Sequence, residues 1–502
     1  MRSEPPRFSP SLQERREALD VRALPVTSTL LTAEWHQARG LTVIVPILPD
    51  RVEALRDTLL QVDLEVRVGK GDRRNPLAAL DGLHFLRWVI LPERVRERGI
   101  RVTPSLVLWT VFDEGRDEHL TKLVQHARAL LDRVYARHCG RWPAKDAPAT
   151  EIVNFLLAHE TDGQVAPYVG TPGVTVPMIE KQDELAKKLS TFVREAKRDD
   201  PTTPNTHVFV AAQRFVDGDE FARDNPELAE FARRAPAAPP QPRSLQGAAI
   251  RALLGIVGVG VLIGLTLGAT YQALYVGAIM GLVAVAAGIA AAWAVVLLLW
   301  LEPRDAERWI PESSRFFDEW DGTLRARDNE APGINRMTIV TDVKAGFVRW
   351  ATMRAVLWLI RFRASRSFEG RLQGVETIHF ANWRLIDSGR RLLFMSNFDG
   401  SASRYLADFS VNATPGVNAI WSNTEGFPPT TALVGEGARD VEAFQNAARV
   451  HQIVTDAWYC GYSDRRMSTR QINDNWRVHR MLRGFPTPAE VDAWVAILEG
   501  RA

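Results

Sequence analysis

Two kinds of hydrophobic patterning alternate along this chain of 502 residues. Short apolar runs bounded by turn residues, such as LTVIVPIL at 41–48 and SLVLWTVF at 105–112, predict β-strands. Longer segments with apolar residues three and four apart, among them 50–62 and 346–364, predict helices that cover those strands. Interleaved strands and helices of this kind indicate an α+β fold.

One strand motif occurs twice, far apart in the chain. LHFLRWVIL at 83–91 matches IHFANWRLI at 378–386, so His84 corresponds to His379. Within the motif, Phe85 also pairs with Phe380 and Trp88 with Trp383. The match continues into the following strand, where 105–112 corresponds to 391–398. Further along the chain, Tyr168 pairs with Tyr459 and Gly170 with Gly461. The chain is therefore predicted to contain an internal duplication.

Each copy reads as strand, helix, strand, strand, helix and a further strand, which is the ferredoxin-like βαββαβ order. We therefore predict a first ferredoxin-like repeat at 41–200 and a second at 335–485. Two such repeats can join their sheets into a single α+β barrel. Residues 1–40 read as a flexible lead-in without the apolar core of a secretory signal, and 201–248 as a helical and Pro-rich linker.

The most hydrophobic segment separates the two copies. No charged residue lies between Arg251 and Glu302, and a helix needs about 20 apolar residues to cross a bilayer. We therefore predict a two-helix transmembrane hairpin at 249–301; the alternative is a buried hairpin in a large soluble core. Arginines on both flanks place both soluble halves in the cytoplasm, on the inner membrane. Glycine rows at four-residue spacing favour close helix packing, which could also join two copies of the chain into a homo-oligomer.

Composition removes several function classes. Its 62 basic and 60 acidic residues leave no basic excess for a nucleic-acid partner. The two cysteines, Cys139 and Cys460, lack the spacing of a zinc site and are too few for a disulfide framework.

Three features could carry chemistry. The repeated His84 and His379 could face a barrel cavity, or could be core histidines with satisfied hydrogen bonds. His451 shares an apolar helical stripe with Phe444, Ala447, Val454 and Trp458, which suits either a core position or a haem ligand. Asp399 follows a strand and precedes a helix, where aspartate commonly caps the helix or forms a turn.

The second half resembles dye-decolorising peroxidases, which are tandem ferredoxin-like proteins that bind haem. The resemblance rests on SNFDG at 396–400, followed by His451 and then by Arg465, Arg466 and Arg470. It implies Asp399 and an arginine, Arg465 or Arg466, on the distal side, and His451 on the haem iron. Ser396 stands where the family motif has glycine. The sequences at 378–401, 415–428 and 458–462 more closely resemble an uncharacterised bacterial family of peroxidase-like tandem-barrel proteins.

These observations favour a membrane-anchored, peroxidase-like oxidoreductase that binds haem or another ligand and acts on lipophilic molecules at the lipid bilayer. Asp399 would then transfer a proton between peroxide oxygens. The alternative is a non-enzymatic membrane scaffold or binding protein whose barrel is packed solid. Fold alone does not decide between them.

Overall fold

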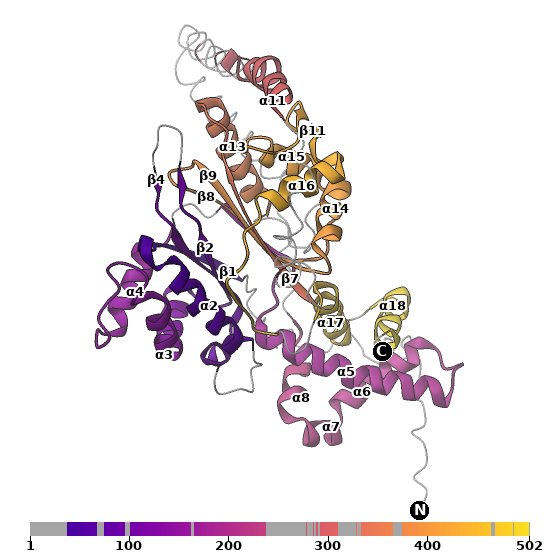
Figure 1. Ribbon diagram of the computed structural model, residues 1–502. Helices are drawn as coiled ribbons and strands as arrows, with labels where there is room; N and C mark the ends of the chain where they lie inside the picture. Colours follow the sequence, from indigo (N-terminus) through magenta and orange to yellow (C-terminus); the bar gives the residue numbers. More distant parts are fainter. Residues whose placement is uncertain are drawn as a thin grey trace, which may run out of the picture. The chain divides into compact units, whose positions relative to one another are not determined.

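The computed structural model divides the described chain into two compact units (Figure 1). Unit 1 comprises Met1–Glu160, Thr171–Pro239 and Asp456–Ala502, and unit 2 comprises Thr161–Gly170 and Pro240–Thr455. The structure describes residues 38–67, 75–95, 101–161, 165–236, 278, 285, 288–289, 292–309, 328, 333–364, 374–462, 467–484 and 486–500.

A four-stranded antiparallel sheet forms the centre of unit 1. Its strand order is β1 (Arg39–Pro46), β5 (Ser105–Phe112), β2 (Leu83–Leu91) and β12 (Ala457–Cys460). Alternate residues of these strands enter one apolar core with side chains of the neighbouring helices. Those helices are α2 (Val52–Val66), α3 (Arg116–Tyr135) and α4 (Ala149–Ala158).

The sheet of unit 2 has the same organisation. Its order is β7 (Ile334–Asp342), β9 (Arg391–Asp399), β8 (Ile378–Ile386) and β6 (Val165–Val169), again antiparallel throughout. The core between this sheet and its helices contains residues of α13 (Phe347–Ala364), α14 (Ala402–Asn412), α15 (Thr414–Trp421) and α16 (Val441–Val450). The α+β class is thereby confirmed, and the shared strand order is compatible with two ferredoxin-like repeats.

The fourth strand of each sheet comes from the other half of the chain. Strand β6, from the first half, pairs with β8, and β12, from the second half, pairs with β2. Equivalent hydrogen bonds fix both pairings: the Gly170 N–H donates to the His379 carbonyl at 2.8 Å, and the Gly461 N–H donates to the His84 carbonyl at 2.9 Å. The predicted 41–200 and 335–485 repeats therefore exchange their last strands.

Side-chain contacts repeat as well as strands. Phe112 stacks on His119 with ring centroids 3.8 Å apart, and Phe398 stacks on Tyr405 at 4.0 Å. The helical ring of each pair, His119 or Tyr405, lies one turn into the helix that follows the third strand of its copy. Its polar atom meets a hydroxyl of that strand, from Thr110 or Ser396 respectively. The duplication thus includes the join between strand and helix.

Six helices of unit 1 pack on a separate apolar core. They are α5 (Val176–Asp199), α6 (Asn205–Asp217), α7 (Asp219–Asp224), α8 (Pro226–Arg233), α17 (Thr469–Leu482) and α18 (Pro488–Glu499). The charged side chains of α5, α6, α7 and α8 thus lie on helices that also bury one apolar face. The smaller elements are η1 (Pro49–Arg51), η2 (Pro76–Ala79), β3 (Arg94–Val95), β4 (Arg101–Val102), η4 (Val296–Leu301), α11 (Glu302–Arg308), β10 (Thr430–Thr431), β11 (Gly435–Glu436) and η7 (Gly437–Arg439).

The predicted transmembrane hairpin is contradicted. Among the residues that the structure describes, no helix combines the length and the apolar character needed to cross a membrane. The described residues 292–301 continue directly into the charged helix α11, whose first residue, Glu302, is buried in unit 2. Most of 249–301, with its glycine rows, lies outside the described residues, as do 1–37. The predictions of a membrane anchor and of an inner-membrane location are therefore not supported by the described residues.

Candidate functional site

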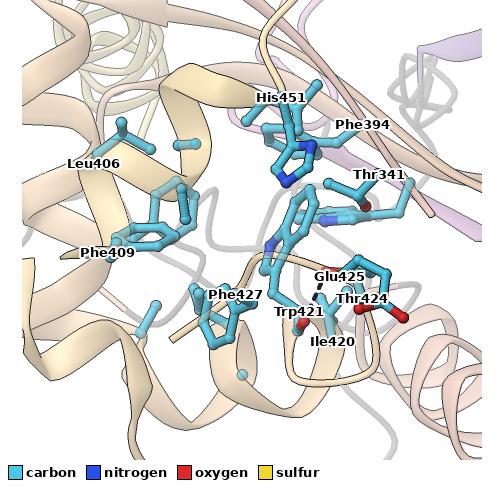
Figure 2. Close-up of a pocket in the computed structure, with 18 of the residues that line it drawn as sticks. Thr341, Phe394, Leu406, Phe409, Ile420, Trp421, Thr424, Glu425, Phe427 and His451 are labelled. Carbon is cyan, nitrogen blue, oxygen red and sulfur yellow. Dashed lines mark hydrogen bonds between the residues drawn. The ribbon is translucent and has the colours of Figure 1, made fainter. Parts of the chain in front are cut away.

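Unit 2 contains an apolar pocket between its sheet and its helices (Figure 2). The pocket holds about 770 Å³ of empty space, including the part open to solvent. The sheet contributes alternate side chains that leave one face, among them Ile339 and Thr341 of β7 and Phe394 of β9. Six aromatic side chains dominate the wall: Trp383, Phe394, Phe409, Trp421, Phe427 and Phe444.

The helices reach the pocket through residues at helical spacing. Helix α14 contributes Leu406 and Phe409, and α15 contributes Val417 together with Ile420 and Trp421. Positions three and four apart lie on one helix face, so each helix presents one apolar stripe to the cavity. Thr424, Glu425 and Phe427, which follow α15, line a further part of the wall (Figure 2).

His451 lies on the pocket wall, where the sequence placed a candidate ligand. Helix α16 ends at Val450, so Phe444, Ala447 and His451 share the predicted stripe, whereas Val454 and Trp458 follow the end of the helix. The imidazole packs on Gly426, whose φ is 77°. A Cβ at Gly426 would meet His451 Nε2 at 2.5 Å. Glycine is therefore required beside this ring.

Asp399 does not line the pocket. Its Oδ1 accepts a hydrogen bond from His379 Nε2 at 2.8 Å. The same pair exists in unit 1, where His84 Nε2 donates to Asp113 Oδ1 at 2.8 Å. Both histidines are fully buried, and each aspartate stands at or just after the end of the neighbouring strand. This duplication favours the core interpretation of His84 and His379, with a carboxylate as the partner.

The predicted arginines do not belong to unit 2, which contains His451. Arg465 and Arg466 lie outside the described residues. Arg470, in the first turn of α17, belongs to unit 1, and its side chain is 84% exposed, 3.8 Å from Asp474. Asp399 is not a helix cap either, because the Ser401 side chain caps α14.

The pocket residues suit a haem poorly. A haem carries two carboxylates, yet none of the described residues that line this pocket is a lysine or arginine. His451 Nε2, which would bind the iron, lies close to Gly426, where an added Cβ would meet it at 2.5 Å. No cluster of three or more metal-ligating side chains occurs in the described part of the chain. An apolar ligand without charge matches the wall better.

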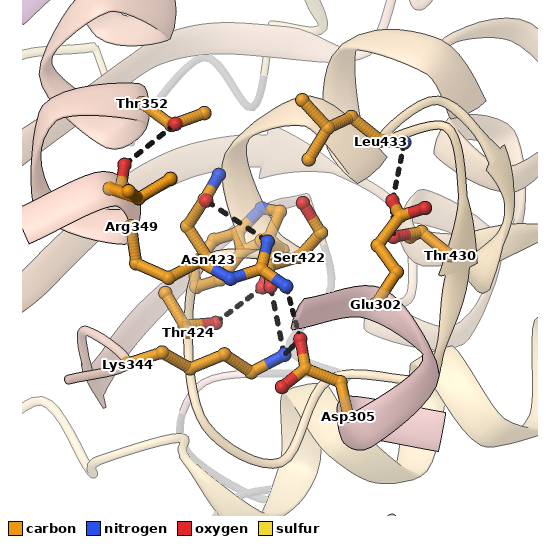
Figure 3. A network of polar contacts seen from close by, with 12 residues as sticks. Glu302, Asp305, Lys344, Arg349, Thr352, Ser422, Asn423, Thr424, Thr430 and Leu433 are labelled. Atoms are coloured by element: carbon orange, nitrogen blue, oxygen red, sulfur yellow. Dashed lines mark hydrogen bonds and ion pairs between the residues drawn. The ribbon is translucent and has the colours of Figure 1, made fainter. Parts of the chain in front are cut away.

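An ion-pair network holds the rim of the pocket in place (Figure 3). Asp305 of α11 accepts hydrogen bonds from Lys344 Nζ, at 2.8 Å, and from Arg349. Lys344 Nζ also donates to the Ser422 carbonyl at 2.9 Å, and its backbone N–H donates to the Asn423 carbonyl at 2.9 Å. Burial lowers the pKa of Lys344, although Asp305 opposes that shift. Residues 422 and 423, which follow the wall residue Trp421, are thus held against α11 and the start of α13.

Glu302 anchors the same helix at a second point. Its carboxylate accepts backbone N–H groups of Ala432, at 2.9 Å, and Leu433, at 2.6 Å, and the Thr430 hydroxyl at 3.2 Å. Sequence reasoning missed this network and most of the pocket wall. The apolar stripes of α14 and α15 were the available signal for the wall, whereas nothing local marks Glu302 or Asp305 as partners of distant loops.

Comparison with known proteins adds no relative. No protein-family model, no curated protein and no solved structure matches this chain. The resemblance to dye-decolorising peroxidases therefore stays a prediction from the sequence.

Proposed function

We propose that unit 2 binds an uncharged, largely aromatic small molecule in its apolar pocket. The observation that carries this proposal is an apolar pocket, partly open to solvent, with six aromatic side chains on its wall. Ligand sites in proteins are typically concave, with predominantly apolar and aromatic walls and a few polar groups. A binding role is favoured over a solid scaffold because protein interiors are normally close-packed, whereas these side chains form a pocket between the sheet and the helices.

The test uses the purified full-length chain and the uncharged fluorescent probe N-phenyl-1-naphthylamine. Ala447 lines the pocket, so Ala447→Trp should fill part of it and weaken probe binding on the order of tenfold. Ala443→Trp, on the same helix but not on the wall, is the matched control and should leave the affinity unchanged. Absence of saturable binding to the wild-type chain, or equal effects of the two variants, would refute the proposal.

The haem hypothesis predicts a different result from the same protein. A haem held by His451 would give a Soret absorption band, and His451→Ala would remove it. The apolar-ligand proposal predicts that the chain binds the probe without such a band, and that His451→Ala changes the probe affinity only modestly. A Soret band that is lost in His451→Ala would replace the proposed ligand with haem.

A further inference from the structure

Two polar groups are buried in the pocket wall without a hydrogen-bond partner among the described residues. They are the Thr341 hydroxyl, on β7, and the Trp383 indole N–H, on β8. These residues are 2% and 4% exposed. The Thr424 hydroxyl of the same wall, in contrast, donates to the Trp421 carbonyl at 2.7 Å. Buried polar groups are normally paired, so each unpaired group needs an explanation.

The two groups leave the same face of the sheet. Ile339, Phe394 and Trp383 form one row across β7, β9 and β8. Thr341 follows Ile339 by two residues, so its side chain points to the same side. Both residues line the pocket. Both side chains therefore project from the helix side of the sheet into the same pocket.

The duplicated unit shows what these positions look like in a filled core. In unit 1, Val43, Leu108 and Trp88 form the equivalent row, so Trp88 corresponds to Trp383 and Val45 to Thr341. The Trp88 indole N–H donates to Tyr135 Oη at 3.3 Å. Val45 carries no polar group and is fully buried. Unit 1 thus pairs its indole inside the protein, whereas unit 2 leaves the indole unpaired and adds a hydroxyl.

We infer that the ligand of unit 2 carries a neutral oxygen acceptor, such as a ketone carbonyl, that accepts hydrogen bonds from Trp383 and Thr341. This inference rests on the proposed function. An indole N–H can only donate, so the ligand must supply an acceptor. A carboxylate or phosphate is disfavoured because the described wall contains Glu425 and no lysine or arginine. The class is therefore an uncharged aromatic carbonyl compound.

The experiment compares two probes of nearly equal shape. The first is 2-acetylnaphthalene, and the second is 2-isopropenylnaphthalene, in which a CH2 group replaces the carbonyl oxygen. Each competes with bound N-phenyl-1-naphthylamine on the full-length chain. We expect the ketone to bind about 3- to 10-fold more tightly than the hydrocarbon, as one or two hydrogen bonds in an apolar site provide.

Variants assign that preference to the two groups. Trp383→Phe and Thr341→Val should each lower the ratio of the two affinities, and the double variant should bring it close to one. Trp88→Phe removes the equivalent indole in unit 1 and should leave the ratio unchanged. Equal binding of both probes to the wild-type chain would overturn the inference and leave the proposed function standing. Binding of neither probe, nor of the fluorescent reporter, would overturn both.

Discussion

The wall of the pocket depends on one buried amide, that of Asn418 on α15. Its Nδ2 lies 3.0, 3.1 and 2.8 Å from the carbonyl oxygens of Val434, Gly435 and Glu436. Its Oδ1 accepts the Ala438 backbone N–H at 2.8 Å. The side chain is fully buried. Asn418 therefore ties the turn of β10 and β11 to the helix that carries Val417, Ile420 and Trp421 into the pocket.

Replacing Asn418 with alanine should destabilise unit 2 by about 4–5 kcal/mol. An amide NH2 has two hydrogens, so the four contacts amount to about three hydrogen bonds, each with a net value of about 1 kcal/mol. Leaving the Ala438 N–H buried without its acceptor adds about 1–2 kcal/mol. For a unit of this size the change lowers the melting temperature by about 10 °C.

The assay is urea unfolding of the full-length chain, followed by tryptophan fluorescence and circular dichroism so that the two units can give separate transitions. Asn412→Ala, at the exposed end of α14, is the control and should stay within about 0.5 kcal/mol of wild type. Asn418→Asp keeps the acceptor but turns a carboxylate toward three carbonyl oxygens, so it should be at least as unstable as Asn418→Ala. A change below about 1 kcal/mol for Asn418→Ala would refute the reasoning.

Three further predictions test other parts of the structure. Gly426→Ala should weaken binding of the naphthylamine probe more than Gly400→Ala. Both glycines have φ near 78°, but only a methyl group at Gly426 would meet the His451 ring. Equal effects of the two variants would contradict this contact. Burial, and then the nearby charge of an arginine, lower the pKa of His479 to about 4. The unfolded chain therefore binds the proton first, and unit 1 should lose about 3 kcal/mol of stability as the pH falls from about 6.5 to 4. His479→Phe should flatten that dependence in urea unfolding, and an unchanged slope would count against it. Glu302→Ala should speed amide hydrogen exchange in the loop after β10 by at least about tenfold, since two N–H groups lose their acceptor; unchanged protection there would show that the carboxylate does not hold the loop.

Local patterns determined most of the secondary structure and the duplication. The runs at 83–91 and 378–386 are strands β2 and β8, and the repeated His84 and His379 occupy equivalent positions with equivalent partners. A period of two in apolar residues is a property of the chain itself, so it can be read without knowing the fold. The stripe containing His451 was read correctly as far as the helix extends.

Other features depend on partners that are distant in sequence. Strands β6 and β12 have the same local pattern, and either sheet could offer an edge to either strand; only the tertiary structure shows that each joins the sheet of the other half. The order of Asp399 and His451 along the chain resembles that of a known family, but order does not fix distance, and the fold turns Asp399 toward His379.

The pocket shows the same division most clearly. Trp88 and Trp383 occupy the same place in the same motif, so the sequence predicts both as strand residues that point into a core. Whether that core is filled depends on the summed volumes of side chains from several elements. Whether the indole is paired depends on a partner from another element, such as Tyr135 beside Trp88. In unit 1 it does, and the indole is paired. In unit 2 the helices leave a cavity instead, because packing is decided by all the contributing elements together and not by any one segment.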